Sequence, residues 1–143
     1  MWADTLLAAE GYHLHRLLLW GAASAVTGTL LLFTIRRPHR SPLIHQFAVQ
    51  CVAWGAIDAA LAVAGLRSLS LRDLGAATQL DRFLWLNLGL DTGYVAVGAT
   101  IALCGWLLGR RYGAVGAGTA VVVQGLALFL LDARFLLLLE RFV

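Results

Sequence analysis

The stretch QCVAWGAID, from Gln50 to Asp58, places an amide and a carboxyl group eight residues apart inside an apolar run. A second stretch, QGLALFLLD, from Gln124 to Asp132, repeats this spacing in a still more apolar context. Eight residues are just over two turns of an α-helix, so the two polar groups of each stretch share a helix face. Both stretches therefore predict a helix that is apolar over most of its surface and polar along one stripe.

The composition around these stretches indicates a membrane protein. The 143-residue chain is 60% hydrophobic and 13% charged, whereas soluble domains are about half apolar and roughly 25% charged. Four apolar stretches each reach the roughly 20 residues that cross a bilayer as a helix. They cover residues 17–35, 43–65, 83–108 and 114–139. Because too little polar sequence remains to cover four buried helices, we expect an all-α polytopic membrane protein with four transmembrane helices.

The basic residues favour one orientation in the membrane. Two short loops, residues 36–42 and 109–113, carry five Arg and no acidic residue. The positive-inside rule predicts that these loops face the cytoplasm and that both termini lie on the opposite side. We expect this membrane to be a bacterial inner membrane. The Arg residues lie in short loops at helix ends, so the sequence contains no nucleic-acid-binding patch.

The segment between the second and third spans, residues 66–81, is polar enough to lie at the membrane surface. Ser70 and Asp73 have the spacing of a capping box, which favours the start of a helix. We therefore expect a short interfacial helix in this segment, with a plain loop as the alternative.

The two halves of the chain share their less common residues. A shift of 74 residues aligns Gln50 with Gln124 and Asp58 with Asp132, and it also aligns two Arg-Arg pairs. This agreement predicts two duplicated antiparallel hairpins related by an axis along the membrane normal. Chance agreement in a chain rich in Ala and Leu is the alternative. The predicted single domain covers residues 1–143, with hairpin A at about 13–67 and hairpin B at about 87–141.

The polar residues of the spans predict a buried layer. Polar side chains are costly in lipid and turn toward the interior of a helix bundle. At a rise of about 1.5 Å per residue, three carboxyl groups lie roughly 10–13 Å inside the terminus-side ends of their spans. Two indole rings share that depth, and the ring of Trp85 lies above them. The candidate ligand-binding residues are Asp91, Asn87, Asp58, Asp132, Gln50, Gln124, Trp54 and Trp20.

Asp91 is the predicted central carboxylate of this layer. It lies deepest of the three carboxyl groups, and Asn87 is one turn away on the same helix face. We expect Gly89 and Gly93 to leave room beside it. Glycines at positions such as 98, 116 and 118 are expected to let helices approach closely.

Three functions fit such a layer. Carboxylates beside aromatic rings suit a cation, so the layer could bind or transport a small cation or a small amphipathic molecule. Alternatively, the chain is an accessory or structural membrane subunit whose carboxyl groups hydrogen-bond within the bundle or pair with Arg16, Arg82 and Arg134. A third reading is an enzyme that acts on a lipid-like substrate with one protonated and one ionised carboxyl group. Nothing else in the sequence specifies a reaction, so the enzyme ranks last.

The histidines and the chain length complete these expectations. His15 and His45 begin the first two spans from opposite sides, so they cannot ligate one haem together. We expect the histidines near loops at the interface, with no metal site and no cofactor. Membrane lipids are the expected partners. Since 143 residues are few for a stand-alone carrier, we also expect a homodimer.

Several motifs together resemble a known family. They are His45-Gln46-Phe47 followed by Trp54 and Asp58, then LNLGLDTGY from Leu86 to Tyr94, then Gln124-Gly125 followed by Asp132. In these residues the chain is similar to a family of small, uncharacterised bacterial four-helix membrane proteins, a domain of unknown function. The chain departs from the family pattern at Ser24 and Asp58, where that pattern has Asn. The resemblance covers nearly the whole chain and implies the four-helix topology without an activity.

Overall fold

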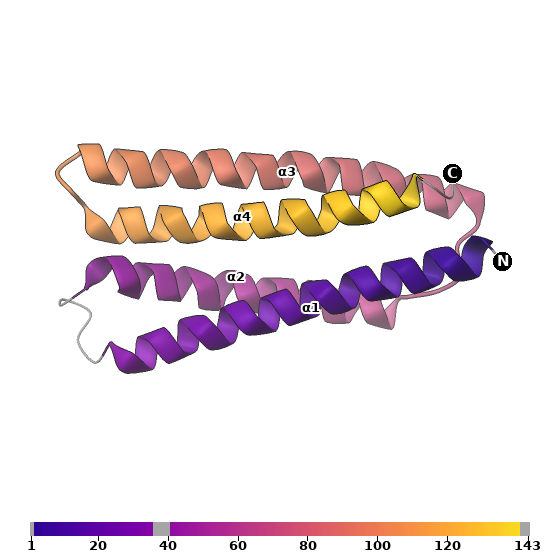
Figure 1. The fold of residues 1–143 in the computed structure, drawn as a ribbon, viewed down its shortest axis with the longest axis horizontal. Helices are drawn as coiled ribbons and strands as arrows, with labels where there is room; N and C mark the ends of the chain where they lie inside the picture. The colour runs from indigo at the N-terminus through magenta and orange to yellow at the C-terminus, as the bar shows by residue number, and fades with distance from the viewer. Residues whose placement is uncertain (1, 36–40, 141–143) are drawn as a thin grey trace.

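Four α-helices account for most of the chain in the computed structural model, which describes residues 2–35 and 41–140 (Figure 1). They are α1 (Trp2–Thr34), α2 (Pro42–Arg67), α3 (Leu74–Leu107) and α4 (Tyr112–Leu139). Each helix is long and apolar enough to cross a membrane. The prediction of an all-α chain with four transmembrane helices is therefore confirmed. Residues 36–40 of the first Arg-rich loop, and residue 141 at the end of hairpin B, lie outside the described residues.

Two helices begin earlier than their apolar stretches. α1 begins at Trp2 and α3 at Leu74, because a helix can continue beyond the hydrocarbon region wherever its sequence permits. The N-cap of α3 is Asp73, whose carboxylate accepts a hydrogen bond of 2.7 Å from the backbone N–H of Ala76. The expected separate interfacial helix is therefore wrong. Residues 74–81 form the first turns of α3, and residues 68–73 connect it to α2.

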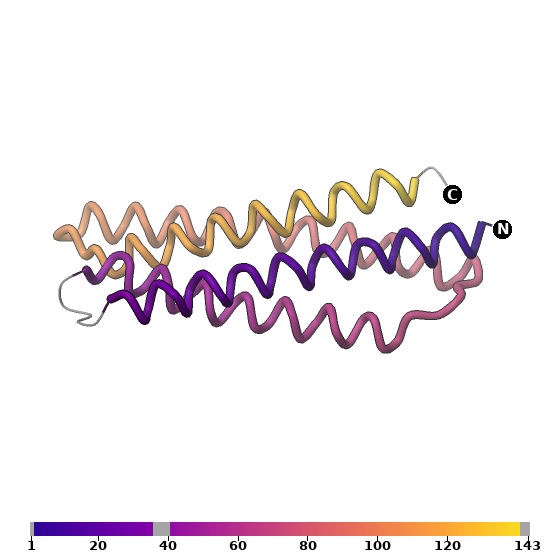
Figure 2. Tube along the Cα trace, turned by 60° about the horizontal axis from the view of Figure 1, so that its bottom comes forward, coloured from indigo at the N-terminus to yellow at the C-terminus, as the bar shows by residue number. Residues whose placement is uncertain are grey.

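The helices pair as two antiparallel hairpins packed side by side. α1 packs against α2 and α3 packs against α4, while α4 also contacts both helices of the first hairpin. Figure 2 shows both termini at one end of the bundle and both hairpin turns at the other. α4 therefore lies where side chains from α1, α2 and α3 meet.

Glycine permits the close approach of the paired helices at several points. A Cβ atom added to Gly21 would lie 2.7 Å from the carbonyl oxygen of Gly55, and one added to Gly98 would lie 2.7 Å from that of Gly118. Gly98 and Gly118 thus have the predicted packing role. The prediction for Gly89 and Gly93 is wrong, because no heavy atom lies within 4 Å of an added Cβ at either position. Both glycines face away from the neighbouring helices, and neither lines a space beside Asp91.

The two hairpins differ in register. A Cβ atom on Gly55 would meet the backbone of Gly21 and Ala25. A shift of 74 carries these three positions to 129, 95 and 99, so residue 129 would lie beside Val95. In the structure Gly125 lies beside Val95 instead, which displaces the contact by one to two helical turns. The duplication itself remains a prediction.

A small apolar core and an ion pair hold the terminus-bearing end together. Side chains of α1, α3 and α4 form the core there: Leu6, Ala77, Leu84, Phe135, Leu136 and Leu139. About one turn after Leu6 on α1, the Glu10 carboxylate accepts two hydrogen bonds from Arg72, at 2.7 and 2.5 Å. These bonds raise the pKa of the Arg72 guanidinium further above its ordinary value. The pair ties α1 to the connection between the hairpins.

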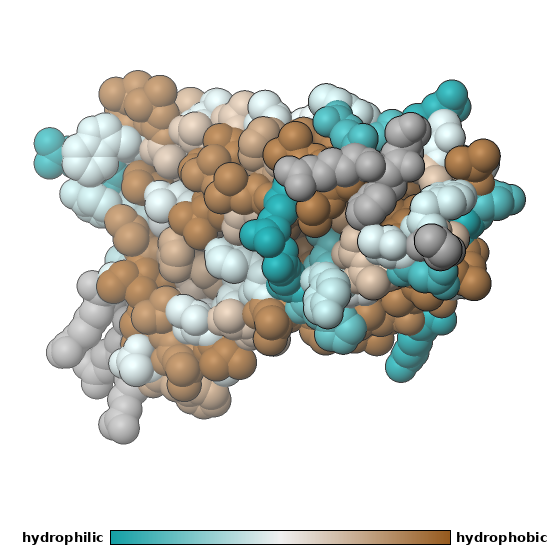
Figure 3. Space-filling view, turned by 45° about the vertical axis from the view of Figure 1, so that its right-hand side comes forward, coloured by the Kyte–Doolittle hydropathy of each residue, from teal (hydrophilic) through white to brown (hydrophobic). Residues whose placement is uncertain are grey.

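The outer surface of the bundle is mainly apolar, as a lipid-facing surface must be. Figure 3 shows apolar side chains over much of the bundle and polar ones gathered toward the end that carries the termini. Large exposed side chains on all four helices contribute to the apolar surface, including Leu19, Leu61, Val97 and Leu130.

Candidate functional site

Four polar side chains lie inside the bundle and form the centre of the site. Asp58, Asp91, Gln124 and Asp132 expose only between 3% and 6% of their surface. They come from α2, α3 and α4, so the bundle brings together residues that lie up to 74 positions apart in the chain. All four were predicted from the sequence to face inward.

Gln124 joins three helices through its side-chain amide. Its Nε2 group donates a hydrogen bond to the carboxylate oxygen Oδ2 of Asp58 on α2. Its Oε1 atom accepts a hydrogen bond of 3.2 Å from the indole nitrogen of Trp20 on α1. Because both ends of the amide are used, Gln124 fixes α4 relative to α1 and α2 at this level.

Asp132 lies in a second group of polar side chains, nearer the terminus-bearing end of α4. Its Oδ1 atom is 3.3 Å from Nε2 of His13 on α1. The His13 ring stacks on Phe135, with ring centroids 4.7 Å apart. The Asn87 side chain of α3 lies beside the same carboxyl group. The expectation that His13 lies near a loop is therefore wrong, because it lies well inside α1 and its ring, packed between α1 and α4, is only 11% exposed.

Asp91 differs from the other buried residues in its lack of partners. Among the described residues, its Oδ2 atom is the buried side-chain nitrogen or oxygen that has no hydrogen-bond partner. The carboxyl groups of Asp58 and Asp132 are close enough to interact with it electrostatically. An unpaired carboxyl oxygen inside a helix bundle carries a desolvation cost of roughly 1–3 kcal/mol. Asp91 is thus the residue of the cluster whose carboxyl group has an oxygen not used in a hydrogen bond.

Trp54 and Gln50 extend the site along α2. The Trp54 indole donates a hydrogen bond of 3.1 Å to Oε1 of Gln50, one turn away on the same helix. The Trp54 ring also contacts Tyr94 of α3, with centroids 5.2 Å apart. These residues form the predicted stripe on α2 and connect α2 to α3, although α2 packs mainly on α1 and α3 packs mainly on α4.

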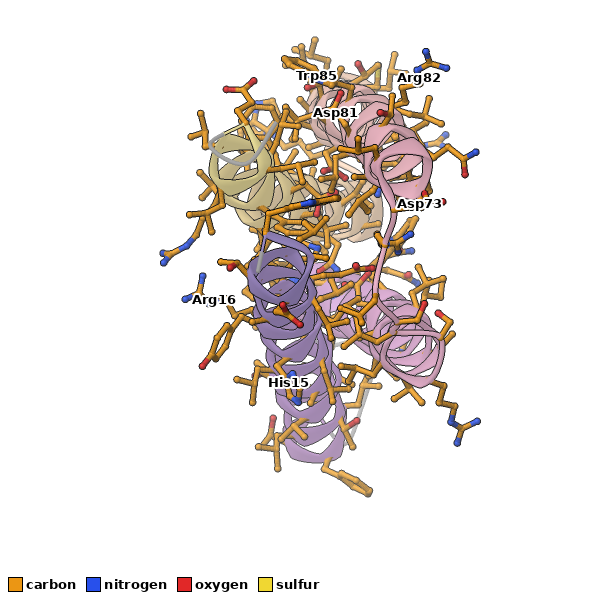
Figure 4. All side chains as sticks on the ribbon, turned by 90° about the vertical axis from the view of Figure 1, so that its right-hand side faces the viewer. His15, Arg16, Asp73, Asp81, Arg82 and Trp85 are labelled. Atoms are coloured by element: carbon orange, nitrogen blue, oxygen red, sulfur yellow. The ribbon has the colours of Figure 1, made fainter. Side chains whose placement is uncertain are left out.

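One expectation about Trp85, and one of the alternatives considered for the carboxyl groups, do not hold. Trp85 is 55% exposed on the outside of α3, and Figure 4 shows it directed outward near Asp81 and Arg82. It therefore does not join the aromatic layer. Within the described residues, Asp132 is paired with His13 and no Arg forms an ion pair with Asp58, Asp91 or Asp132.

A groove runs along the outside of the bundle between α1 and α4. The part nearer the termini has a volume of 240 Å³ and is lined by residues that include His13 and Phe135. The part nearer the hairpin turns has a volume of 580 Å³ and is lined by residues that include Trp20 and Ala127. Arg16, Leu131 and Arg134 line both parts. His13 and Trp20 therefore separate this groove from the buried polar cluster.

The donor groups of the cluster do not have the arrangement of a metal site. Within residues 2–35 and 41–140, no three His, Cys, Asp or Glu side chains are placed to hold one metal ion. The cluster offers instead one unpaired carboxyl oxygen, two further carboxyl groups and the indole rings beside them.

Four apolar helices around a buried polar cluster define an integral membrane protein of the helix-bundle class. Residues 16–133 match the family of unknown function DUF6992, and the chain belongs to that family. This match confirms the resemblance to an uncharacterised family. No curated protein and no solved structure matches the chain.

Proposed function

We propose that this membrane protein binds a small cation at the buried polar cluster, with Asp91 as the central carboxylate. The observation that carries the proposal is the Oδ2 atom of Asp91, which is buried and has no hydrogen-bond partner. Buried polar groups in folded proteins are nearly always paired, so an unpaired carboxyl oxygen favours a site that a ligand completes. Intramembrane ionisable residues are functional candidates for the same reason.

The chemistry of the cluster favours an ammonium-type cation. An N–H group of such a cation can donate to Asp91, and the charge is further favoured by Asp58 and Asp132. Indole rings attract ammonium groups through their faces, and Trp20 and Trp54 supply two such rings on α1 and α2. A metal ion is a poorer fit, because the described side chains offer no three-ligand group.

The α1–α4 groove argues against a cationic amphipathic molecule as the ligand. Arg16 and Arg134 both line the groove, and their charges repel a positive headgroup. A compact cation held by the interior carboxyl groups avoids both arginines. We extend the proposal to transport, because the cluster belongs to the apolar segments of the helices rather than to their connections.

An accessory or structural subunit is the second candidate function. The observation that favours it is the number of polar groups that pair with one another, such as Gln124 with Asp58 and Trp20, and Asp132 with His13. Such bonds fix the relative positions of helices without any ligand. Under this alternative, the Asp91 carboxyl group belongs to a structural network, and its Oδ2 atom has no ligand to bind.

The finer location and the assembly are part of the same proposal. We place the protein in a bacterial inner membrane with Arg110 and Arg111 at the cytoplasmic end, following the positive-inside rule. Homodimerisation remains a prediction.

A thermal-shift experiment with an Asp91→Asn variant tests the cation site. Wild type in a neutral detergent is heated with methylammonium, guanidinium or sodium chloride at constant ionic strength. We expect one of the organic cations to raise the Tm of wild type and not that of Asp91→Asn, because a ligand stabilises only the state that binds it. The matched control is Asp81→Asn on the same helix, which lies outside the cluster and should keep the wild-type shift.

Two results would reject the proposal in favour of the accessory subunit. One is a wild-type Tm that none of the cations changes between about pH 5 and pH 9, the range in which a perturbed carboxyl group titrates. The other is an equal shift in wild type and Asp91→Asn, which would place the cation elsewhere on the protein.

A further inference from the structure

The groove between α1 and α4 contains two arginines without partners. Within the described residues, neither Arg16 nor Arg134 makes a hydrogen bond or an ion pair. Figure 4 shows Arg16 extending outward from α1 on the side where α4 flanks it. Among the described residues, no acidic side chain lines either part of the groove, and His13 adds a third nitrogen-bearing side chain. The groove is therefore complementary to a negative charge.

Both arginines lie about one hydrocarbon-core thickness from the hairpin-turn ends of their helices. Arg16 is 18 residues from the end of α1 at Thr34, which is about 27 Å along the helix. Arg134 is 22 residues from the start of α4 at Tyr112, which is about 33 Å. The hydrocarbon core of a bilayer is about 30 Å thick. If the hairpin turns mark one boundary of that core, the two guanidinium groups mark the other.

The groove changes character on the hairpin-turn side of the arginines. There its lining is apolar and comes from both helices: Leu19, Ala23, Ala127 and Leu130. The two alanines leave the space that the larger neighbours do not fill. The groove is positively charged at the arginines and apolar toward the hairpin turns. This arrangement matches a molecule with an anionic head and a hydrocarbon chain.

We propose that this groove binds one anionic phospholipid, with its phosphate between Arg16 and Arg134 and an acyl chain along Ala23 and Ala127. Guanidinium groups bind phosphate oxygens in two-pronged hydrogen bonds, which suits a pair of arginines at the headgroup level. Basic sites between transmembrane helices are favourable places for such headgroups. The proposal goes beyond the cation site, since the lipid touches Arg16 and Arg134 and not Asp91.

The bound lipid would also cover the outer side of the cluster. His13 lines the groove and contacts Asp132, and Trp20 lines the groove and donates to Gln124. A phospholipid in the groove thus packs against the two residues that separate the cluster from the membrane. Its presence excludes other molecules from this side of the cluster.

The test measures the thermal stability of purified protein in a neutral detergent during titration with dioleoylphosphatidylglycerol. Parallel titrations use dioleoylphosphatidylcholine and inorganic phosphate. We expect the anionic lipid alone to raise the Tm of wild type, through preferential binding to the folded state. Each of Arg16→Gln and Arg134→Gln should raise the half-maximal lipid concentration about five-fold, and the double variant on the order of 25-fold.

Two further variants locate the lipid. Arg82→Gln removes an exposed arginine of α3 on the same side of the membrane and should leave the titration unchanged. Ala23→Phe keeps both arginines and fills the apolar part of the groove, so it should abolish the lipid-induced shift. All variants are compared by size-exclusion elution, so that a loss of folding is recognised.

Several outcomes would overturn the proposal. An equal rise in Tm with phosphatidylcholine would show that the negative charge of the lipid is not recognised. An equal rise in Tm with inorganic phosphate would show that the groove binds a small anion rather than a lipid. Unchanged titrations for a folded double arginine variant, or for folded Ala23→Phe, would place the lipid outside this groove. Asp91→Asn should keep the lipid-induced shift whether or not the cation site exists, so the two proposals fail separately.

Discussion

At the scale of single residues, the cluster was predictable where a polar residue interrupts an apolar run. Asp58, Asp91, Gln124 and Asp132 each stand in such a run, and the cost of exposing them to lipid determines that they turn inward. Their partners were not predictable in the same way. Which carboxyl group meets Gln124 depends on how the two hairpins pack, and one sequence does not determine that packing.

His13 belongs to the site but was not among the residues predicted from the sequence. It stands before the first apolar stretch, so its composition context suggests an interfacial residue. A signal was nevertheless present, because His13 is seven residues from Trp20 and seven residues are about two helical turns. Continuing the inward stripe of Trp20 toward the N-terminus would have placed His13 on the inner face of α1.

We predict that Gln124→Leu destabilises the bundle by about 1–2 kcal/mol. The change leaves the Asp58 carboxylate and the Trp20 indole without their shared partner in an apolar interior. Unfolding in increasing amounts of sodium dodecyl sulfate, followed by tryptophan fluorescence, measures the effect.

The corresponding control is Gln50→Leu, which removes a bond within α2 only. We expect it to change the free energy of unfolding by roughly half a kcal/mol or less, the range of an average interaction inside a membrane bundle. Equal losses in the two variants would contradict the view that Gln124 joins three helices.

At the scale of helices, the apolar stretches gave the number of elements and the approximate positions of their ends. The starts of α1 and α3 were wrong because hydropathy reports where lipid ends, whereas helix ends depend on capping and packing. Asp73 caps α3 well before its apolar stretch begins, and Leu6 and Ala77 belong to the apolar core although both lie outside the predicted spans. Glycine positions were likewise visible, but not which glycines face a neighbour.

We predict that Gly118→Ala disrupts the contact of α3 with α4. An added Cβ would meet the Gly98 carbonyl oxygen and the Ala102 backbone, which cannot move aside as a flexible side chain can. Overpacking of this kind costs about 1–3 kcal/mol. The measurement is again unfolding in sodium dodecyl sulfate.

Gly93→Ala is the matched control, since open space surrounds Gly93. There the substitution should leave stability unchanged or increase it by up to about 1 kcal/mol, because Ala is the better helix former. Should Gly118→Ala behave like Gly93→Ala, the close contact of α3 with α4 would be incorrect.

The connection between the hairpins provides another prediction. Arg72→Gln removes the two hydrogen bonds to the Glu10 carboxylate, which is buried against the terminus-bearing end. We expect faster proteolysis within residues 68–73 while the spans stay intact, because local opening depends on the contacts of the segment itself. Arg67→Gln, at the exposed end of α2, serves as the control and should leave the proteolysis rate unchanged.

At the scale of the whole molecule, one end of the bundle combines most of the polar features. The ion pair of Glu10 with Arg72, the groove arginines and the Asp132 group all belong to the terminus-bearing part of the helices. The opposite part is held by glycine contacts such as Gly98 with Gly118. The part near the hairpin turns is thus held by close helix packing, whereas the candidate sites lie in the part nearer the termini.

The orientation of that polar end is the last prediction. The hairpin turns should face the cytoplasm, because their Arg residues are concentrated in short loops, whose basic residues bias insertion most strongly. In a background with both cysteines replaced by Ala, single cysteines are introduced as Tyr112→Cys at the turn and Ser70→Cys between the hairpins. Both positions are exposed and lie at opposite ends of the bundle. Intact bacterial cells with a permeabilised outer membrane are treated with a maleimide that does not cross the inner membrane. We expect Ser70→Cys to react in these cells and Tyr112→Cys to react only after lysis, whereas the reverse pattern would place the polar end, with both candidate sites, toward the cytoplasm.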